Sequence, residues 1–461
     1  MHEQQPLFYQ RILSSKKSKI IFFFSVVLIF STIGLVISEA SFLIRNRIHD
    51  HVSIGDIDVG GLSIEEAEKK IKSVFQQKMQ NPPLTAVYQD KFWTISKESI
   101  ALKINSSLLA QEAYQVGRTD SVMSTVEETI KLYSNKKVTL PFSVKYDQEK
   151  LHAILTNIAA DIDKAPENGL VTIIDNKIKI IPHTNGLAVD LPRTLGEIAA
   201  GFGAKLNFSF PVAVKETVPP VTTDQLADID VLLATYTTYF NPYDYNRNHN
   251  IILSAQRLNN TLVKTAETFS FNNTVGSRYE LDGYLQAPGY IDGELVPDWG
   301  GGVCQVAGTL YNSILLAGLT VVERTSHLYP PGYVPLGRDA TVAYGSLDLK
   351  FQNNLAYPVY IITAVTSDTV TINMYGKNLP GAPKFDVVTQ YEKSIPYRTV
   401  VKKDPTLPQG KRTIKEKGAY GMVISSYRLE QINGKTVKEE LLATDHFIPQ
   451  DRVELLGTKP V

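Results

Sequence analysis

The residue with the clearest chemical capacity in this sequence is its single cysteine, Cys304. It follows the run Gly300-Gly301-Gly302, and the residues after it show helical spacing of apolar side chains up to Gly318. The free amides and the dipole at a helix N-terminus favour an anion, so this position favours thiolate over thiol. The glycines leave room for a carbonyl carbon beside the sulfur, and nearby amides could stabilise an oxyanion. The pattern indicates a cysteine nucleophile.

A cysteine nucleophile needs a base, and His327 is the candidate for that role. The segment over 319–327 is expected to begin as a buried strand that brings His327 close to Cys304 near its end. Asp339 is the best carboxylate for orienting the imidazole, although a backbone carbonyl could do the same. The predicted catalytic set is therefore Cys304, His327 and Asp339.

A second group of residues is expected to contact a substrate. Arg338 is a candidate for bidentate binding of a substrate carboxylate. The complete predicted substrate-binding set is Gly301, Gly302, Gln305, Thr309, Arg338 and Tyr344.

These residues also have a simpler structural interpretation. A lone cysteine after glycines is commonly a small packed residue, and His327 could cap a strand end. Arg338 could pair with Asp339, while Gln305 and Thr309 could satisfy backbone groups. The catalytic interpretation is favoured because four features occur together: one cysteine, glycines before it, a helix after it, and a histidine on the next strand.

Composition excludes several classes of function. Lysine plus arginine equals aspartate plus glutamate at 47 each, which argues against a nucleic-acid partner. One cysteine excludes a disulfide within the chain and a thiolate metal cluster. Nucleotide-binding and metalloprotease motifs are missing from the sequence. We therefore expect neither a metal nor a cofactor.

Residues 20–38 carry no charge and no proline, and they are long enough to cross a bilayer. Basic residues precede this segment closely and an acidic residue follows it, which places the N-terminus in the cytoplasm. The alternative is a cleaved signal peptide, but its apolar core would be shorter and residues 38–40 are a poor cleavage site. We expect a single-pass anchor in the cell membrane, with residues 39–461 outside the cell.

The chain, at 461 residues, is too long for one ordinary domain, and its patterns predict an α+β multidomain protein. Helix-like and strand-like segments recur in the same order over 59–215, which predicts two copies of one small α+β unit; chance similarity is the alternative. Asn433-Gly434 between two strand-like runs predicts a hairpin. The predicted order is a cytoplasmic tail (1–19), a transmembrane helix (20–38), a stalk (39–58), the duplicated unit (59–215), a linker (216–229), an α+β domain (230–384) and a small all-β module (385–461).

A series of short segments surrounds the candidate nucleophile in a fixed order. They are ETFSFN (267–272), GGGVCQ (300–305) with TLYN (309–312), VER (322–324) with His327, YVP (333–335) with GRDATVAYG (337–345), and DL (348–349) with FQNN (351–354). In these segments the chain resembles the VanW domain over residues 246–375, roughly a third of its length. At 307–308 this sequence has Ala-Gly where that family more often has two serines, which removes a serine role there and leaves the cysteine.

Two further resemblances flank this one. Residues 59–215 resemble the repeated domain assigned to peptidoglycan binding, and residues 385–461 resemble a G5 domain, a module associated with cell-wall sugars or proteins. The architecture resembles surface proteins of Gram-positive bacteria. Its expected partners are the stem peptides and glycan of peptidoglycan.

Some proteins with this architecture are regarded as L,D-transpeptidases that use the VanW cysteine. The resemblance therefore implies a membrane-anchored enzyme that crosslinks stem peptides through a thioester on Cys304. The alternatives are a non-catalytic wall-binding protein with a structural cysteine, and an enzyme that hydrolyses the same bond. Thiol reactivity separates the first alternative from the enzymes.

Overall fold

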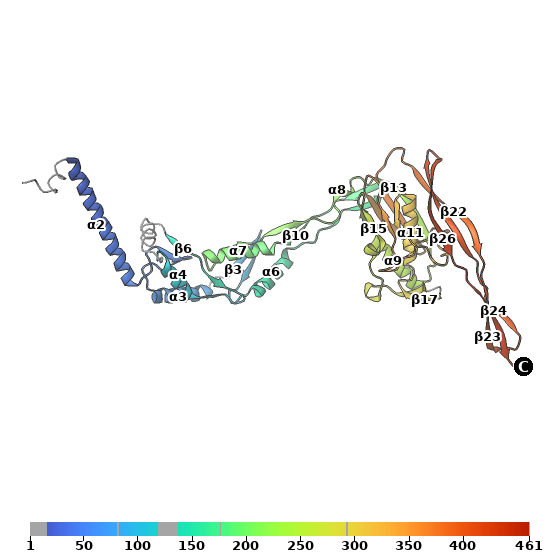
Figure 1. Ribbon diagram of the computed structural model, residues 1–461, viewed down its shortest axis with the longest axis horizontal. Coiled ribbons are helices and arrows are strands. Elements are labelled where there is room, and N and C mark those ends of the chain that lie inside the picture. Colours follow the sequence, from blue (N-terminus) through green and yellow to red (C-terminus); the bar gives the residue numbers. More distant parts are fainter. Residues whose placement is uncertain (1–15, 81–82, 119–136, 176, 292–293, 461) are drawn as a thin grey trace, which may run out of the picture. The chain divides into compact units, whose positions relative to one another are not determined.

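The computed structural model describes residues 16–80, 83–118, 137–175, 177–291 and 294–460 (Figure 1). They form a mixed α/β protein with two compact units. The first unit runs to Ala165 and resumes over 185–217, while the second consists of 166–184 and the chain from Val218 onward.

The N-terminal helix α2 spans Lys16–Arg45. Its part Lys16–Gly34 has a mean hydropathy of 1.7 and is not buried by the rest of the described chain. Within the described residues, this is the one helix long and apolar enough to cross a membrane. Its length and composition fit a membrane anchor and a signal sequence alike.

The first unit contains two apolar cores that interleave along the chain. One core lies among helices α3 and α4 and a small sheet; the other lies among helices α6 and α7 and the strands beside them. The elements of the first core are α3 (Ile64–Gln80), α4 (Ser106–Gln115) and the sheet β2-β1-β6 (Ile57–Asp58, Val52–Ile54, Val138–Leu140). Those of the second are α6 (Gln148–Ile162), α7 (Leu191–Ala204), the sheet β11-β3-β4 (Ser209–Pro211, Leu84–Tyr88, Lys91–Ile95) and the pair β10-β12 (Gly186–Val189, Val214–Thr217).

Helix starts in this unit follow capping chemistry. Ser63 and Glu66 bond each other's backbone amides at the start of α3, which is a capping box. Asn105 and Asp190 cap α4 and α7 with their side chains, and each directly follows a short strand, β5 (Lys103–Ile104) or β10. Strand β5 pairs with β7 (Val144–Lys145). This shared strand–cap–helix order is the local basis of the expected duplication, which stays a prediction.

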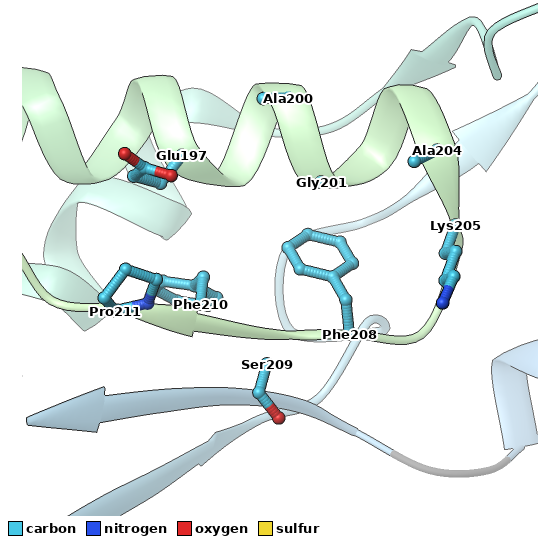
Figure 2. A pocket seen from close by; sticks show the side chains of 9 residues that line it. All are labelled: Glu197, Ala200, Gly201, Ala204, Lys205, Phe208, Ser209, Phe210 and Pro211. Carbon is cyan, nitrogen blue, oxygen red and sulfur yellow. The ribbon is translucent and has the colours of Figure 1, made fainter.

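Helix α7 lies close to the chain just before β11 because Gly201 has no side chain. Gly201 faces the ring of Phe208, which packs edge-on against Phe202 at 5.2 Å between centroids. A depression of about 220 Å³ lies beside this contact, with Glu197 and Lys205 among its lining residues (Figure 2).

The second unit is built on the antiparallel sheet β13-β21-β20-β14. Along β20, Val359 and Ile361 face the main core, whereas Tyr360 faces a smaller core on the opposite side, as strand alternation requires. Helices α9 and α11 pack on the main-core side, and the hairpin β8-β9 with α8 contributes to the other core. The elements are β13 (Val231–Tyr239), β21 (Thr369–Gly376), β20 (Val359–Val365), β14 (Thr261–Val263), α9 (Tyr245–Leu258), α11 (Val303–Leu316), β8 (Leu170–Ile174), β9 (Lys177–Ile181) and α8 (Thr223–Leu226).

A second small sheet, β15-β19-β18, corrects one expectation. The strand expected before His327 to be buried is β18 (Thr320–Glu323), whose residues alternate between exposed and half-buried. It lies at the sheet edge with one neighbour, so one side of the strand faces outward. It also ends four residues before His327, which therefore sits on a loop. The remaining elements here are β15 (Thr268–Ser270), β19 (Lys350–Gln352), α10 (Phe271–Val275), the 3₁₀ turn η1 (Glu280–Asp282) and the hairpin β16-β17 (Gln286–Ile291, Glu294–Trp299).

The C-terminal module is all β, as predicted. Its two sheets are β22-β25-β26 and β23-β27-β24. The predicted hairpin at Asn433-Gly434 is confirmed, with φ of 50° and 75° as a tight two-residue turn requires. The strands are β22 (Lys384–Ile395), β25 (Gly421–Ile432), β26 (Lys435–Phe447), β23 (Thr399–Pro408), β27 (Arg452–Lys459) and β24 (Arg412–Glu416).

This module is joined to the chain that follows α11. Ser426 Oγ donates to the Gly337 carbonyl at 2.8 Å, and Arg428 donates to the Leu319 carbonyl at 2.7 Å. The Ile448 amide donates to the Leu328 carbonyl at 3.0 Å. The loop that carries His327 is therefore fastened to the module on both sides.

Two glycines of α7 give a matched test of the packing in the first unit. An added Cβ at Gly201 would lie 2.1 Å from the Phe208 ring, whereas at Gly196 nothing lies within 4 Å. Gly196→Ala should stabilise the protein by about 0.5–1 kcal/mol through helix propensity. Gly201→Ala should destabilise it by about 1 kcal/mol or more, because the ring must move. Thermal unfolding measures both; equal effects would show that the ring yields freely.

Candidate active site

The glycine run before Cys304 has a conformational cause. Gly300 and Gly302 have φ of 78° and 108°, which other residues rarely adopt, and Gly302 is the N-cap of α11. A Cβ on Gly301 would lie 2.7 Å from the Ala287 carbonyl oxygen. The helix begins at Val303, so Cys304 occupies its first turn, as the sequence predicts.

Cys304 is half-buried, and its thiol faces two partners. Its Sγ donates to the Val342 carbonyl at 3.6 Å, and it interacts with the His327 ring as a hydrogen-bond partner and as a charge. Burial alone would raise the pKa of the thiol. The hydrogen bond and charge of His327, with the charge of Arg278, outweigh burial and lower that pKa. The site therefore favours thiolate.

Asp339 holds His327 at two points. The backbone amide of His327 donates to Asp339 Oδ2 at 2.7 Å, and ring Nδ1 lies 2.6 Å from the same oxygen. Burial alone would lower the pKa of His327, but hydrogen bonds to Asp339 and Cys304 and their charges raise it to about 9. With Nδ1 bonded to Asp339, Nε2 is the ring nitrogen left to serve the cysteine.

Asp339 is itself buried and depends on Arg324. Arg324 Nη2 lies 3.1 Å from Asp339 Oδ1, and its Nε donates to the Asp339 carbonyl at 2.6 Å. Burial alone would raise the pKa of Asp339; the bonds from His327 and the charge of Arg324 hold it below its usual value. Arg324 Nη1 also donates at 2.5 Å to Asp445 of β26. The three charged side chains are at most 6% exposed.

The predicted substrate-binding residues of α11 are occupied by protein groups. Gln305 donates to Thr238 Oγ1 at 3.0 Å and to the Tyr239 carbonyl at 2.9 Å, and it accepts from Arg247 at 2.6 Å. Thr309 bonds the Gln305 carbonyl and Thr238, each at 2.7 Å. These contacts join α11 to β13. A direct contact of either side chain with substrate stays a prediction.

Arg338 and Tyr344 occupy different surroundings. Arg338 donates to Asn312 Oδ1 at 2.6 Å and lies over the ring of Tyr236 at 5.2 Å, about two helical turns beyond Cys304 along α11. Tyr344 is 50% exposed and interacts electrostatically with Arg278. A substrate role for each also stays a prediction.

Two arginines beside the cysteine escaped the sequence reasoning. A Cβ on Gly302 would lie 3.0 Å from Arg247 Cγ, and one on Gly300 would lie 3.1 Å from Arg278 Cβ. Burial lowers the pKa of both guanidinium groups, and the charge of Cys304 opposes that shift in each. No motif marks Arg278. Arg247, in the polar start of α9, looks like a solvent-facing residue.

Tyr333 is a third residue that was missed. Its ring lies against Gly308, where a Cβ would be 3.3 Å from the ring edge. In the described part of the chain its buried hydroxyl has no hydrogen-bond partner. Burial and the negative charges of Cys304 and Asp339 raise its pKa well above the usual value, so it stays a proton donor. Such a hydroxyl could stabilise an oxyanion.

Other features of the described chain lie away from this cysteine. A cavity of about 810 Å³ lies at the C-terminal end of α11, with Leu316 and Phe385 among its lining residues. That end is about 20 Å from Cys304 along the helix. Among the described residues, no group of three or more metal-ligating side chains could hold a metal ion.

Comparisons with known families match three segments of the chain. Residues 246–375 match the family described as "VanW like protein", and residues 386–459 match "G5 domain". Residues 93–207 match the family described as "Putative peptidoglycan binding domain".

Curated relatives match over longer stretches. "Uncharacterized protein YoaR" of Bacillus subtilis (strain 168) is 33% identical over 280 residues, which is 58% of this chain and 88% of that protein. "Vancomycin B-type resistance protein VanW" of Enterococcus faecalis (strain ATCC 700802 / V583) is 29% identical over 163 residues, which is 34% of this chain and 59% of that protein.

Two solved structures match short parts of this chain. One is described as "IgA1 Protease G5 domain structure", with 22% identity and a TM-score of 0.13 over 18% of this chain and 99% of that one. The other, "Crystal structure of HP0197-G5", has 24% identity and a TM-score of 0.11 over 16% of this chain and 99% of that one.

The lowered thiol pKa predicts how Cys304 reacts. Iodoacetamide should alkylate it at pH values where an ordinary thiol is still protonated, because the neighbouring imidazolium stabilises the thiolate. Asp339→Asn should shift the rate profile to higher pH, since it removes the carboxylate that keeps His327 charged. A small thiol provides the reference. Reaction only after denaturation would indicate a structural cysteine.

The buried ion network predicts a large effect on stability. Arg324→Ala would leave two buried carboxylates without their cation, so it should destabilise the protein by about 3–5 kcal/mol. Arg412→Ala removes an exposed arginine paired with Glu454 and should cost less than about 1 kcal/mol. Chemical denaturation of both variants checks the difference. Equal losses would contradict the assigned importance of Arg324.

Proposed function

The chain belongs to the VanW family, and from this premise we propose that it is a cysteine-dependent L,D-transpeptidase of the bacterial cell wall. The observation that carries the proposal is the array Cys304–His327–Asp339, in which a helix N-terminal thiol faces an imidazole held by a buried carboxylate. This arrangement suits acyl transfer, because it supplies a nucleophile, a proton carrier and an orienting group.

The first half of the reaction forms a thioester. The Cys304 thiolate attacks the carbonyl carbon of a stem-peptide bond, and the carbonyl oxygen becomes an oxyanion. The buried, unpartnered Tyr333 hydroxyl is the candidate donor to it, because the amides of Val303 and Gln305 already bond the carbonyls of Gly300 and Gly302. The carbon–nitrogen bond then breaks. The departing amine takes the proton of the His327 imidazolium, and the terminal D-residue leaves as a free amino acid.

The second half transfers the acyl group. An amine from a second stem peptide attacks the thioester and gives up a proton to neutral His327. The carbon–sulfur bond breaks, the thiolate returns, and an amide crosslink remains. Asp339 stays ionised throughout, because its pKa lies below its usual value, and it stabilises the imidazolium that is present before the first half and is regained in the second.

The other segments of the chain are consistent with an enzyme that acts on the cell wall. The apolar helix α2 would anchor the chain in the membrane with the bulk outside. The segment that matches a peptidoglycan-binding family would hold the polymer near the enzyme. Tethering of this kind raises the effective concentration of stem peptides at the cysteine.

Crosslinking of muropeptides tests the proposal. Full-length chain in detergent is incubated with disaccharide tetrapeptides, and products are identified by mass spectrometry. Cys304→Ala and His327→Ala should each abolish dimer formation, and the double variant should be little worse, because residues that act as a unit are non-additive. Asp339→Asn should lower the rate less than either. Thermal melts of each variant separate lost chemistry from lost fold.

The pH profile of the same reaction carries a further expectation. The rate constant kcat/KM should fall as pH rises through about 9, because the His327 imidazolium that protonates the leaving amine is then lost. It should fall on the acid side as the thiolate is protonated. Full activity of folded Cys304→Ala would contradict the proposal and favour a wall-binding protein. Release of the terminal residue without dimers would indicate hydrolysis.

A further inference from the structure

We propose that Arg247 and Arg278 form a subsite for the free C-terminal carboxylate of the acyl-donor peptide, one residue beyond the bond that Cys304 attacks. The identity of the donor rests on the proposed function, whereas the anion site itself rests on the geometry around the glycine run. The subsite therefore selects a donor peptide that has one residue after the scissile bond.

The two arginines approach the cysteine from different elements. Arg247 comes from the first turn of α9, and Arg278 follows α10. Their stems lie against Gly302 and Gly300, at 3.0 Å and 3.1 Å from where a Cβ would be. A larger side chain at either glycine would displace an arginine. The run that precedes the nucleophile therefore leaves space for two guanidinium groups as well as for a carbonyl carbon.

Both charges lack a carboxylate partner. In the described part of the chain, no aspartate or glutamate lies within ion-pair distance of Arg247 or Arg278. Within the described residues, each donates to a neutral amide oxygen, Arg247 to that of Gln305 and Arg278 to that of Asn272. Arg278 is only 8% exposed, and its buried Nε has no hydrogen-bond partner there. Besides the Cys304 thiolate, neither guanidinium has an anion in ion-pair contact within the described residues, so an incoming carboxylate gains at this place.

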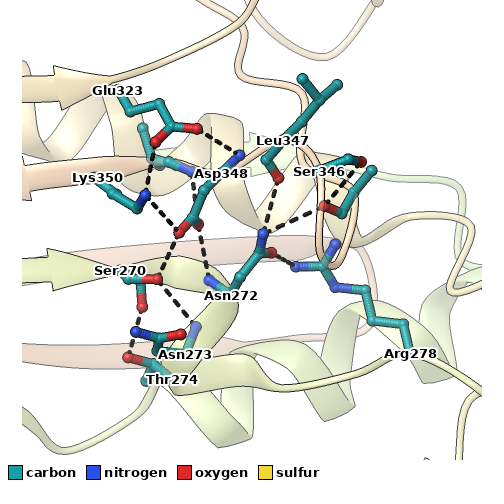
Figure 3. Close-up of polar contacts among 12 residues, drawn as sticks. Ser270, Asn272, Asn273, Thr274, Arg278, Glu323, Ser346, Leu347, Asp348 and Lys350 are labelled. Atoms are coloured by element: carbon teal, nitrogen blue, oxygen red, sulfur yellow. Dashed lines mark hydrogen bonds and ion pairs between the residues drawn. The ribbon is translucent and has the colours of Figure 1, made fainter.

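An extended network holds Arg278 in place (Figure 3). Arg278 donates to Asn272 Oδ1, while Asn272 Nδ2 donates to the Leu347 carbonyl at 2.9 Å. The Asn272 amide donates to Asp348 Oδ1 at 2.9 Å, and Ser270 Oγ bonds the other oxygen of Asp348 at 2.5 Å. The guanidinium is thus oriented by a hydrogen bond to a neutral amide, and the Asp348 charge that acts on it comes from a carboxylate that forms no ion pair with it. Such preorganisation is what a binding site needs.

The reaction supplies the matching anion. When Cys304 attacks the last peptide bond of a donor, the carboxylate belongs to the very next residue, whose Cα is about 3.8 Å from the Cα before it. Both arginine stems pack against glycines within four residues of Cys304, which puts them beside the place for an anion one residue from the attacked carbonyl, and the charge of Cys304 acts on both. Guanidinium groups bind carboxylates with charge-assisted, directional hydrogen bonds. A longer donor would place a neutral amide there instead.

Binding measured without catalysis tests this subsite. Full-length Cys304→Ala chain in detergent is titrated calorimetrically with acetyl-L-lysyl-D-alanine and with its C-terminal amide. The acid should bind roughly tenfold more tightly or better, as expected for hydrogen bonds to a charged group. Adding Arg278→Gln or Arg247→Gln should bring the acid-to-amide ratio close to one. The lysine replacements should restore part of it, because they keep the charge and lose the fork.

A matched control uses an arginine that has its own carboxylate. Arg428 pairs with Glu440 at 2.8 Å, so Arg428→Gln should leave the acid-to-amide ratio unchanged. Thermal melts identify any variant that fails to fold, and for such a variant the lysine replacement carries the test.

Three outcomes would overturn the subsite. The first is equal binding of the acid and the amide, and the second is that neither binds at millimolar concentration. The third is a preference for the acid that survives both glutamine replacements. A rise in the alkylation pKa of Cys304 in Arg278→Gln, with the acid preference intact, would also overturn it and leave Arg278 as a thiolate partner alone. The binding test in Cys304→Ala and the crosslinking test in the unsubstituted chain are independent. If Cys304→Ala prefers the acid but the unsubstituted chain forms no crosslinks, the proposed function is refuted and the anion site stands. If the unsubstituted chain forms crosslinks but Cys304→Ala shows no preference for the acid, the anion site is refuted and the proposed function stands.

Discussion

The rest of the site depends on one buried carboxylate, that of Asp339. It accepts hydrogen bonds from the backbone and the ring of His327, and it is paired with Arg324. Burying such a charge is unfavourable unless it is fully paired, which explains why Arg324 lies behind it and Asp445 lies behind Arg324. Each of these buried charges is stable only when the opposite charge beside it is present. The orientation of the imidazole is therefore tied to a residue of the C-terminal module.

The arginines of this site have two different kinds of partner. Arg324 is neutralised by two carboxylates and serves to hold other groups. Arg247 and Arg278 instead bond neutral amide oxygens, so their charges remain available. In a site that would carry a thiolate and a substrate carboxylate together, available positive charge is the complementary feature. The contrast separates groups that build the site from groups that would bind a ligand.

Local features were predictable from the sequence, because short-range chemistry determines them. Helix periodicity and the glycines placed Cys304 in the first turn of α11, and Asn433-Gly434 marked its hairpin. Contacts between residues far apart in the sequence could not be predicted, because no local pattern marks them. Arg278 follows no motif, and Asp445 lies 121 residues from the arginine that it pairs with. The strand before His327 reads as buried because its residues are apolar, but its position at a sheet edge is a property of the whole fold.

If Cys304 forms a covalent acyl intermediate, the intact mass of the protein will show it most directly. After brief mixing with a disaccharide tetrapeptide and no added acceptor amine, we expect an adduct whose mass equals that of the donor minus the released terminal amino acid. Peptide mapping should place it on Cys304, and hydroxylamine should remove it as it removes a thioester. An unmodified chain that nonetheless produces crosslinks, or an adduct on any other residue, would contradict the account.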